Sequence, residues 1–198
     1  MIKFNNINQE IPYKIFEEKY NKSLQAQQKN IEAICISSYS KEKSEVNARF
    51  VNLKFIDNKE FIFFSNYKSP KSQDFTSHNQ ITGLIYWSSI DVQIRIKANI
   101  KRTSKKYNQA YFSKRSSKKN ALAISSNQSS VIKSYASVEN EYKKTLKNKN
   151  LNICPDYWGG YSFTPYYFEF WQGHEFRLNK REAYELNNSQ WMHSYLEP

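Results

Sequence analysis

The feature that most constrains this chain is a succession of short runs in which apolar and polar residues alternate. In residues 91–102 the polar positions are Gln93, Arg95 and Lys97, which predicts a strand with one apolar face and one polar, basic face. Similar β-rich runs occur four times before this strand, and strands return from Tyr161 onward. The four earlier runs cover residues 31–39, 46–56, 60–66 and 81–87.

Helix-like segments interrupt these runs. Aromatic residues recur at three- and four-residue spacing in residues 12–29, which predicts an amphipathic helix. Ser69 is suited to an N-cap and Pro70 to the first helical position, so a short helix is expected after them. Two polar and basic segments, 104–124 and 138–147, are also predicted to be helical.

The order of these elements predicts a mainly β chain with peripheral helices, of the α+β class, built around an antiparallel β-barrel. We expect a single domain over residues 1–198, because the C-terminal strands alone are too few for a stable sheet. Residues 12–150 would supply barrel strands and a helical insertion, and residues 151–198 would complete the barrel and the active site.

The positive charge of the chain is concentrated in one segment. The formal net charge is +12, and residues 95–149 contain 15 Lys and Arg against two acids, Glu139 and Glu141. A solvated surface rich in lysine would explain this excess, as would binding to nucleic acid or to phosphorylated small molecules. No recognisable nucleic-acid-binding motif accompanies the charge, so nucleic acid is the least favoured partner.

Several function classes lack their usual signatures. Cys35 and Cys154 cannot form a disulfide framework, which favours a reduced, cytoplasmic protein, and no apolar run is long enough to span a membrane. The three histidines show no metal-ligand spacing, so no metal site is expected. The chain has no glycine-rich nucleotide motif and no evident catalytic triad. Any chemistry would therefore depend on a bound organic cofactor.

Four places combine phosphate-binding residue types with strand ends. They are ARFVNLK, FFSNYKSPKSQ at a helix start, the polar loop SSNQSS, and FWQGHEFRLNKR, where Trp171 precedes two arginines. Hydroxyl groups, ammonium groups and free N–H groups at a helix N-terminus suit a phosphate, and an aromatic ring beside guanidinium suits a flat heterocycle carrying an anion. Each place alone is weak, since such residues usually have only a structural role.

In this order, however, the blocks resemble the pyridoxamine (pyridoxine) 5′-phosphate oxidase family. The resemblance extends from about Pro12 to the end of the chain, and its most specific part is WGGYSFTPYYFEFWQGHEFRLNKR, from Trp158 to Arg181. It implies an antiparallel FMN-binding split β-barrel that works as a homodimer, with FMN held at the subunit interface by both chains.

The resemblance also implies which residues form the site. The FMN ligands would be Arg49, Phe50, Val51, Asn52, Leu53, Lys54, Phe64, Ser65, Lys71, Gln93, Gln128, Ser129, Trp171 and Arg181. The substrate would contact Lys54, Tyr111, Arg115, Lys119, Arg177 and Asn179. Arg177 would lie beside the pyridine ring and act as the catalytic residue.

The implied reaction is oxidation of pyridoxamine or pyridoxine 5′-phosphate to pyridoxal 5′-phosphate. A hydride passes to N5 of the flavin, and dioxygen reoxidises the flavin to give hydrogen peroxide. The alternatives are an FMN-dependent oxidoreductase acting on another small heterocycle, and a relative that binds flavin or pyridoxal phosphate without catalysis.

Three positions depart from the family pattern. Pro70 replaces an arginine expected near the flavin phosphate, Lys119 replaces a serine, and Asn179 replaces an active-site histidine. The basic N-terminal arm of some members is not seen before Pro12. An amide cannot carry charge near neutral pH, whereas Lys119 could contact a substrate phosphate more strongly than a hydroxyl. These departures predict either reduced activity or an altered substrate.

Overall fold

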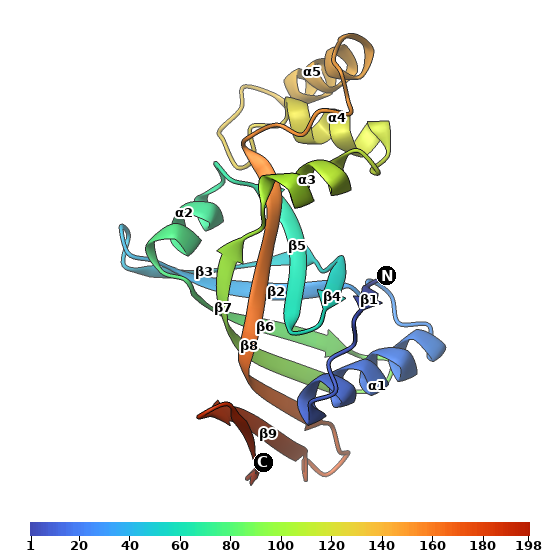
Figure 1. Ribbon diagram of the computed structural model, residues 1–198, viewed down its shortest axis with the longest axis vertical. Helices are drawn as coiled ribbons and strands as arrows, with labels where there is room; N and C mark the ends of the chain where they lie inside the picture. Colours follow the sequence, from blue (N-terminus) through green and yellow to red (C-terminus); the bar gives the residue numbers. More distant parts are fainter.

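The computed structural model describes residues 1–198 and shows a twisted sheet with five helices around it (Figure 1). The strands are β1 (Lys3–Asn5), β2 (Ala33–Ser40), β3 (Glu45–Asn52), β4 (Phe55–Asp57), β5 (Glu60–Asn66), β6 (Gln80–Trp87), β7 (Val92–Arg102), β8 (Trp158–Gln172), β9 (Lys180–Asn187) and β10 (Gln190–Leu196). The helices are α1 (Ile11–Gln25), α2 (Pro70–Ser77), α3 (Lys105–Phe112), α4 (Ser117–Ser125) and α5 (Tyr135–Asn148).

Strand β8 is the central strand of the sheet, because it pairs with three other strands. It pairs with β7 from Tyr161 to Gln172, while its first part pairs with β5 and its last part pairs with β9. The strand order is β1-β4-β5-β8-β7-β6-β2-β3, and every pairing is antiparallel except that of β1 with β4. The two ends of this order do not pair, so the barrel is open. The predicted fold class, mainly β with peripheral helices in a split barrel, is confirmed.

Alternation of side chains in β7 produces the core. Val92, Ile94 and Ile96 are fully buried, as the sequence pattern predicts, and their polar neighbours lie on the opposite face of the sheet. Helix α1 covers one opening of the barrel and inserts Phe16 between Phe61 and Trp87, with ring centroids 5.1 and 5.5 Å away. Burial of such large rings is the main stabilising contribution of this helix.

The elements differ from the predicted ones in several places. The run 46–56 is two strands, because the chain turns at Leu53, whose N–H donates to the Glu32 carbonyl and whose side chain is fully buried. The segment 104–124 is two helices, with the Asn120 amide donating to the Phe112 carbonyl at the break. Strand β8 begins three residues before the predicted Tyr161, and β1 was not predicted at all.

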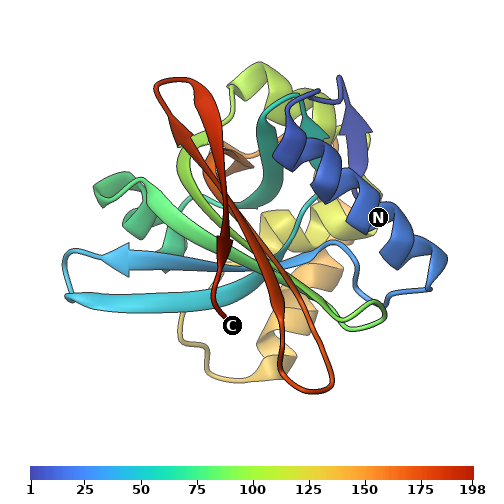
Figure 2. The same cartoon turned by 90° about the horizontal axis from the view of Figure 1, so that it is seen from below.

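The helical insertion and the C-terminal hairpin lie at opposite ends of the molecule. Helices α3, α4 and α5 gather at one end of β5 and β8 (Figure 1), and the β9–β10 hairpin extends from the other end (Figure 2). No helix is both long and apolar enough to cross a membrane.

Two glycines allow the helical insertion to dock closely on β8. The Gly160 N–H donates to Asn108 Oδ1 of α3 at 2.8 Å, and the Gly160 carbonyl accepts from the Tyr67 hydroxyl at 2.9 Å. A Cβ atom at Gly159 would lie 2.2 Å from the Tyr67 hydroxyl and 2.3 Å from the Asn108 amide nitrogen. The backbone contact therefore fixes the position of α3 and of Trp158, the first residue of β8.

We predict that Gly159→Ala destabilises the protein, because the added methyl group must displace the buried Asn108 and the half-buried Tyr67, which are hydrogen-bonded to each other. The expected loss is about 1–3 kcal/mol, the usual cost of overpacking. Urea unfolding of the variant and the parent protein measures it, and equal unfolding free energies would contradict this account of the glycine pair.

Candidate functional site

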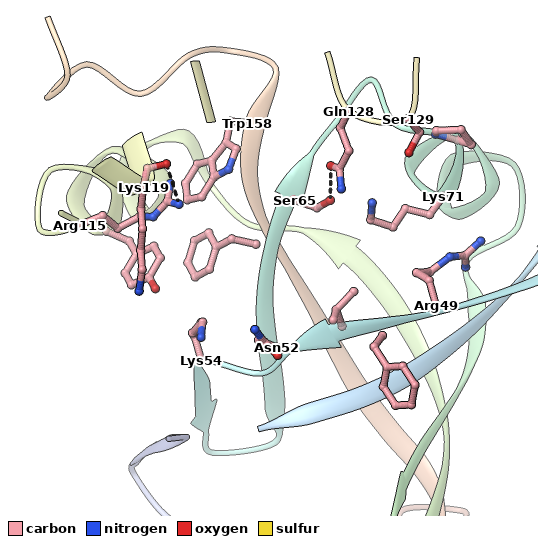
Figure 3. A pocket seen from close by; sticks show the side chains of 15 residues that line it. Arg49, Asn52, Lys54, Ser65, Lys71, Arg115, Lys119, Gln128, Ser129 and Trp158 are labelled. Atoms are coloured by element: carbon pink, nitrogen blue, oxygen red, sulfur yellow. Dashed lines mark hydrogen bonds between the residues drawn. The ribbon is translucent and has the colours of Figure 1, made fainter. Parts of the chain in front are cut away.

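A cavity of about 570 Å³ opens beside β3, β5 and the helical insertion (Figure 3). It is lined by Arg49, Phe50, Val51, Asn52, Lys54, Phe64, Ser65, Pro70, Lys71, Tyr111, Arg115, Lys119, Gln128, Ser129 and Trp158. All except Pro70 and Trp158 are residues that the sequence analysis assigned to the cofactor or the substrate. The fold thus brings together predicted residues that are up to 80 positions apart, from Arg49 to Ser129.

One end of the cavity holds Lys71 and Arg49 near the polar loop after α4 (Figure 3). Lys71, in the first turn of α2, is buried and its ammonium group has a single hydrogen-bond partner, the Ser69 hydroxyl at 3.2 Å. Burial, with a contribution from the Arg49 guanidinium, lowers the pKa of Lys71 to about 8. This end of the cavity is therefore favourable for an anion, which would stabilise the ammonium form.

Arg49 is held in place by side chains from β2 and α2. Its guanidinium donates to the Ser38 hydroxyl at 2.7 Å and lies 3.8 Å from the carboxylate of Asp74, which is buried. The loop that contributes Ser129 is fixed to β5, because Gln128 Oε1 accepts hydrogen bonds from the Ser65 hydroxyl and the Asn66 N–H, both at 3.3 Å. The donors at this end are thus positioned before any ligand arrives.

The other end of the cavity gathers Lys54, Arg115 and Lys119 (Figure 3). Burial lowers the pKa of Lys54, and repulsion from Lys119 and Arg115 adds to this effect, while Glu32, 4.0 Å away, opposes it. The Nη1 atom of Arg115 is buried and has no hydrogen-bond partner. The residues that line the cavity include no carboxylate to balance these three cations, so this end is also favourable for an anion.

Aromatic rings form the wall between these ends. Phe64 stacks on Tyr111 with centroids 3.9 Å apart and on Trp158 with centroids 5.1 Å apart. The Arg115 guanidinium lies over the Trp158 ring, 4.4 Å from its centroid. The sequence motif that begins at Trp158 did not predict that this residue lines the site. The signal that could have indicated it is an aromatic residue at the start of a strand, followed by two glycines.

A second cluster of predicted residues lies elsewhere on the sheet. Gln93 on β7 pairs with Trp171 on β8, which pairs with Arg181 on β9, so the three form one row. Arg181 donates through Nε and Nη2 to Glu169 at 3.0 and 2.9 Å. Arg95 and the Tyr167 hydroxyl also donate to Glu169, which is almost fully buried. This carboxylate therefore holds Arg181 in a fixed orientation.

Arg177 and Asn179 belong to the loop that joins β8 to β9, close in sequence to this second cluster. Arg177 is exposed and has a φ of 61°, in the left-handed region that residues other than glycine seldom adopt. Neither residue lines the cavity described above. The structure thus divides the predicted residues into a cavity group and a β8–β9 group.

The two groups lie some distance apart within one chain. Paired residues form a row from Phe50 through β2, β6 and β7 to Glu169, a separation of four strand spacings or about 19 Å. The sheet face along this row carries two exposed aromatic rings, Phe50 at the edge of the cavity group (74% exposed) and Tyr86 on β6 (55% exposed). The side chain of Leu53, also predicted as a cofactor ligand, is in the core, so only its backbone is available to a ligand.

Comparison with known proteins identifies the family. The family model described as "Pyridoxamine 5'-phosphate oxidase" matches residues 20–147, and that described as "Pyridoxine 5'-phosphate oxidase C-terminal dimerisation region" matches residues 158–198. This chain belongs to the pyridoxamine 5′-phosphate oxidase family. The second match covers the β8–β9 group and supports a homodimer.

Individual relatives agree with this assignment. Pyridoxine/pyridoxamine 5'-phosphate oxidase 1 of Hydrogenovibrio crunogenus is 31% identical over 191 residues, which cover 94% of this chain and 88% of that protein. The enzyme of the same name from Leptospira biflexa is 36% identical over 155 residues, covering 77% of this chain and 73% of that protein.

Two solved structures share the fold. PhzG from Burkholderia lata 383, in complex with tetrahydrophenazine-1-carboxylic acid, superimposes with a TM-score of 0.87 at 22% identity, covering 94% of this chain and 92% of its own. A pyridoxamine 5'-phosphate oxidase-related, FMN binding protein from Nostoc punctiforme PCC 73102 gives a TM-score of 0.76 at 10% identity, covering 96% and 99%.

FMN is the cofactor of this family, and the cavity fits it. The fit rests on the buried Lys71 ammonium with a single hydroxyl partner and on the hydroxyl and amide groups of Ser65, Gln128 and Ser129 beside it. A phosphate supplies the negative charge and the acceptor oxygens that suit an ammonium group and hydroxyl and amide donors. No group of three or more His, Cys, Asp or Glu residues could hold a metal ion.

We predict that FMN affinity depends on pH through Lys71. The pKa of about 8 belongs to the protein without a neighbouring anion, and phosphate binding favours the protonated form. Affinity should therefore be constant below pH 8 and fall above it by roughly tenfold per pH unit, until the pH reaches the raised pKa of the complex. Titration of apoprotein with FMN between pH 7 and 9.5 measures this fall.

The Lys71→Met variant is the control for this titration. It should bind FMN more weakly at pH 7 and show no decrease between pH 7 and 9.5 that can be ascribed to an ammonium group. A Lys71→Met variant with the same pH profile as the parent protein would show that another group titrates.

We further predict that Glu169→Gln destabilises the chain by about 3 kcal/mol, because two guanidinium groups lose their shared carboxylate. Burial alone raises the pKa of Glu169, but hydrogen bonds from Arg95, Arg181 and Tyr167 outweigh it and hold the pKa below 4.5. The stability that this carboxylate contributes is thus fully present above pH 4.5, the ordinary pKa of glutamate. It is lost as the pH falls through the lower pKa that Glu169 has in the folded protein. Urea unfolding at pH 7 and pH 3 should show the difference between the variant and the parent shrinking at pH 3.

Proposed function

We propose that this protein is an FMN-dependent pyridoxine/pyridoxamine 5′-phosphate oxidase that produces pyridoxal 5′-phosphate. The observation that carries the proposal is the pair of cation groups, Lys71 with Arg49 and Lys54 with Arg115 and Lys119, at opposite ends of one aromatic-walled cavity. Two phosphates that bind in one cleft repel each other unless each has its own cations. Two relatives that are 31% and 36% identical to this chain are named as enzymes with this activity.

The first cation group is assigned to the flavin phosphate and the second to the substrate phosphate. Arg115 contributes its guanidinium charge, and Tyr111 contributes a hydroxyl group in the same cavity. Lys119, where the family usually has serine, adds a third cation near Lys54 and Arg115. The extra charge favours a substrate that carries a full phosphate dianion.

The complete site is proposed to require two copies of the chain. Gln93, Trp171 and Arg181 would reach the flavin bound in the partner's cavity, and Arg177 would reach the substrate there. Support comes from the dimerisation-region match over residues 158–198 and from the exposed rings of Phe50 and Tyr86 on the face between the two groups. Exposed aromatic rings of this size mark a surface that another protein surface covers.

When bound, FMN supplies the two-electron acceptor for oxidation of the substrate. The substrate carbon that bears the amine or hydroxyl group loses a hydride, and the amine or hydroxyl group loses a proton. For the amine, water then replaces the nitrogen and gives the aldehyde, while dioxygen takes up the two electrons as hydrogen peroxide. The chain's part is to align the rings and exclude water, and Arg177 stabilises charge that develops beside the reacting carbon.

An oxidase of another small heterocycle is the second candidate, and Asn179 is the observation that favours it. The family's histidine is absent from this position, so a contact that selects the usual substrate is changed. The structural neighbour PhzG was solved with tetrahydrophenazine-1-carboxylic acid, a tricyclic carboxylate. Such a ligand lacks the phosphate that the second cation group would bind, which leaves the phosphorylated vitamers as the first choice.

We predict that purified protein with FMN oxidises pyridoxamine or pyridoxine 5′-phosphate under air with release of peroxide. Arg177→Ala should lower kcat by about 100- to 1,000-fold while FMN remains bound, because it removes an electrostatic contact made at the reacting carbon. Lys105→Ala is the matched control, since Lys105 is exposed and paired with Asp156 outside the cavity. Absence of turnover with both vitamers would reject the proposed function.

A further inference from the structure

We infer that Asn179 is a positioning residue, whose side-chain oxygen closes the β8–β9 loop so that Arg177 is presented in one conformation. The inference rests on the proposed function for the role of Arg177, and on the geometry of the loop for the role of Asn179. It differs from the role given to Asn179 by the sequence, which was direct contact with the substrate.

The start of the loop is fixed to the turn between β6 and β7. The Gly173 N–H donates to the Asp91 carbonyl at 3.0 Å, and the Gln172 amide donates to the Ile90 carbonyl at 3.0 Å. Gly173 lies so close to the Asp91 side chain that a Cβ atom would be 1.7 Å from its Oδ2. The loop therefore leaves β8 at a fixed point and in a fixed direction.

Within the loop, His174 is the acceptor for two backbone groups. The Arg177 N–H donates to the His174 carbonyl at 2.9 Å, which forms a tight turn, and the Phe176 N–H donates to His174 Nδ1 at 3.2 Å. The turn places Arg177 at a φ of 61°. Because this backbone conformation is unfavourable for arginine, neighbouring contacts must hold it.

Asn179 provides the contact that joins the two ends of the loop. Its Oδ1 accepts the His174 N–H at 3.1 Å, across five positions of the chain. Residues 174–178 are exposed, whereas Asn179 is half-buried at the start of β9. A half-buried amide at the root of an exposed loop is placed to restrict the loop.

The same geometry explains how an amide can occupy the position of the family's histidine. An imidazole Nδ1 and an asparagine Oδ1 are both one bond from Cγ, so either can accept a hydrogen bond from the same N–H. The replacement keeps this acceptor and removes the more distant ring nitrogen. What the loop needs at residue 179, on this view, is an acceptor one bond beyond Cγ.

The test compares three substitutions in the FMN-loaded dimer. Asn179→Leu has nearly the shape of asparagine and no acceptor, whereas Asn179→Asp and Asn179→His keep one. Asn179→Leu should lower kcat/KM about 10- to 100-fold through misplacement of Arg177, with FMN binding unchanged. In an Arg177→Ala background the same substitution should change kcat/KM less than about twofold, because its effect passes through Arg177. Equal losses in the two backgrounds would show direct substrate contact and overturn the inference.

Hydrogen–deuterium exchange of the peptide covering residues 173–179 gives a readout that is independent of turnover. The His174 amide should exchange slowly in the parent protein and in the Asn179→Asp and Asn179→His variants, and much faster in Asn179→Leu. Unchanged exchange of the His174 amide in Asn179→Leu would show that Asn179 does not restrict the loop and would overturn the inference. If the parent protein oxidises neither vitamer but the exchange pattern holds, the proposed function fails and the positioning of the loop by Asn179 stands.

Discussion

Repulsion among closely spaced cations is the constraint on which this site depends. Lys71, Arg49, Lys54, Arg115 and Lys119 line one cavity, and only Asp74 and Glu32 lie within ion-pair distance of any of them. Bringing these charges together lowers the stability of the protein until anions enter. The cations come from five parts of the chain, namely β3, the turn before β4, helix α2, the turn after α3, and helix α4, so the fold sets the spacing between them. On the proposed function, these cations are the groups that two phosphates would neutralise.

The rigid elements are held by contacts far from the charges. The Gly159–Gly160 pair allows Asn108 and Tyr67 to hydrogen-bond to the backbone at the start of β8. These contacts fix the position of α3, which carries Tyr111, relative to the sheet. At the other end of β8, the buried Glu169 carboxylate fixes Arg181. Strand β8 therefore links the cavity group, through Trp158, to the β8–β9 group. The distance of about 19 Å between the two groups is the reason for proposing that a second copy of the chain unites them.

Much of this arrangement could be predicted from the sequence. Alternation in residues 91–102 gave the buried face of β7 correctly, and the ordered motifs identified the family and thirteen of the fifteen residues in the cavity lining. Other features depend on tertiary contacts that no local pattern encodes. The turn at Leu53 follows from a hydrogen bond to Glu32, and the three-residue strand β1 is too short to show periodicity.

The site itself shows the same limit. Trp158 lines the cavity because of the neighbouring glycines and Phe64, which only the folded sheet brings together. The sequence predicts that Asn179 contacts the substrate in place of an active-site histidine, whereas the structure shows its Oδ1 accepting a hydrogen bond from the His174 N–H. A side chain's hydrogen-bond partner depends on loop geometry, and the loop here is set by the distant Asp91 turn.

Subunit mixing tests most directly whether the site is shared between two chains. Lys71→Met disables the cavity of its own chain, and Arg177→Ala disables the loop of its own chain. If sites are shared, each mixed dimer contains one site with both parts intact, so an equal mixture of the two variants should recover about a quarter of the parent activity. If each site is built from one chain, no site in the mixture is intact. Activity no higher than the mean of the two variants would then contradict the shared site.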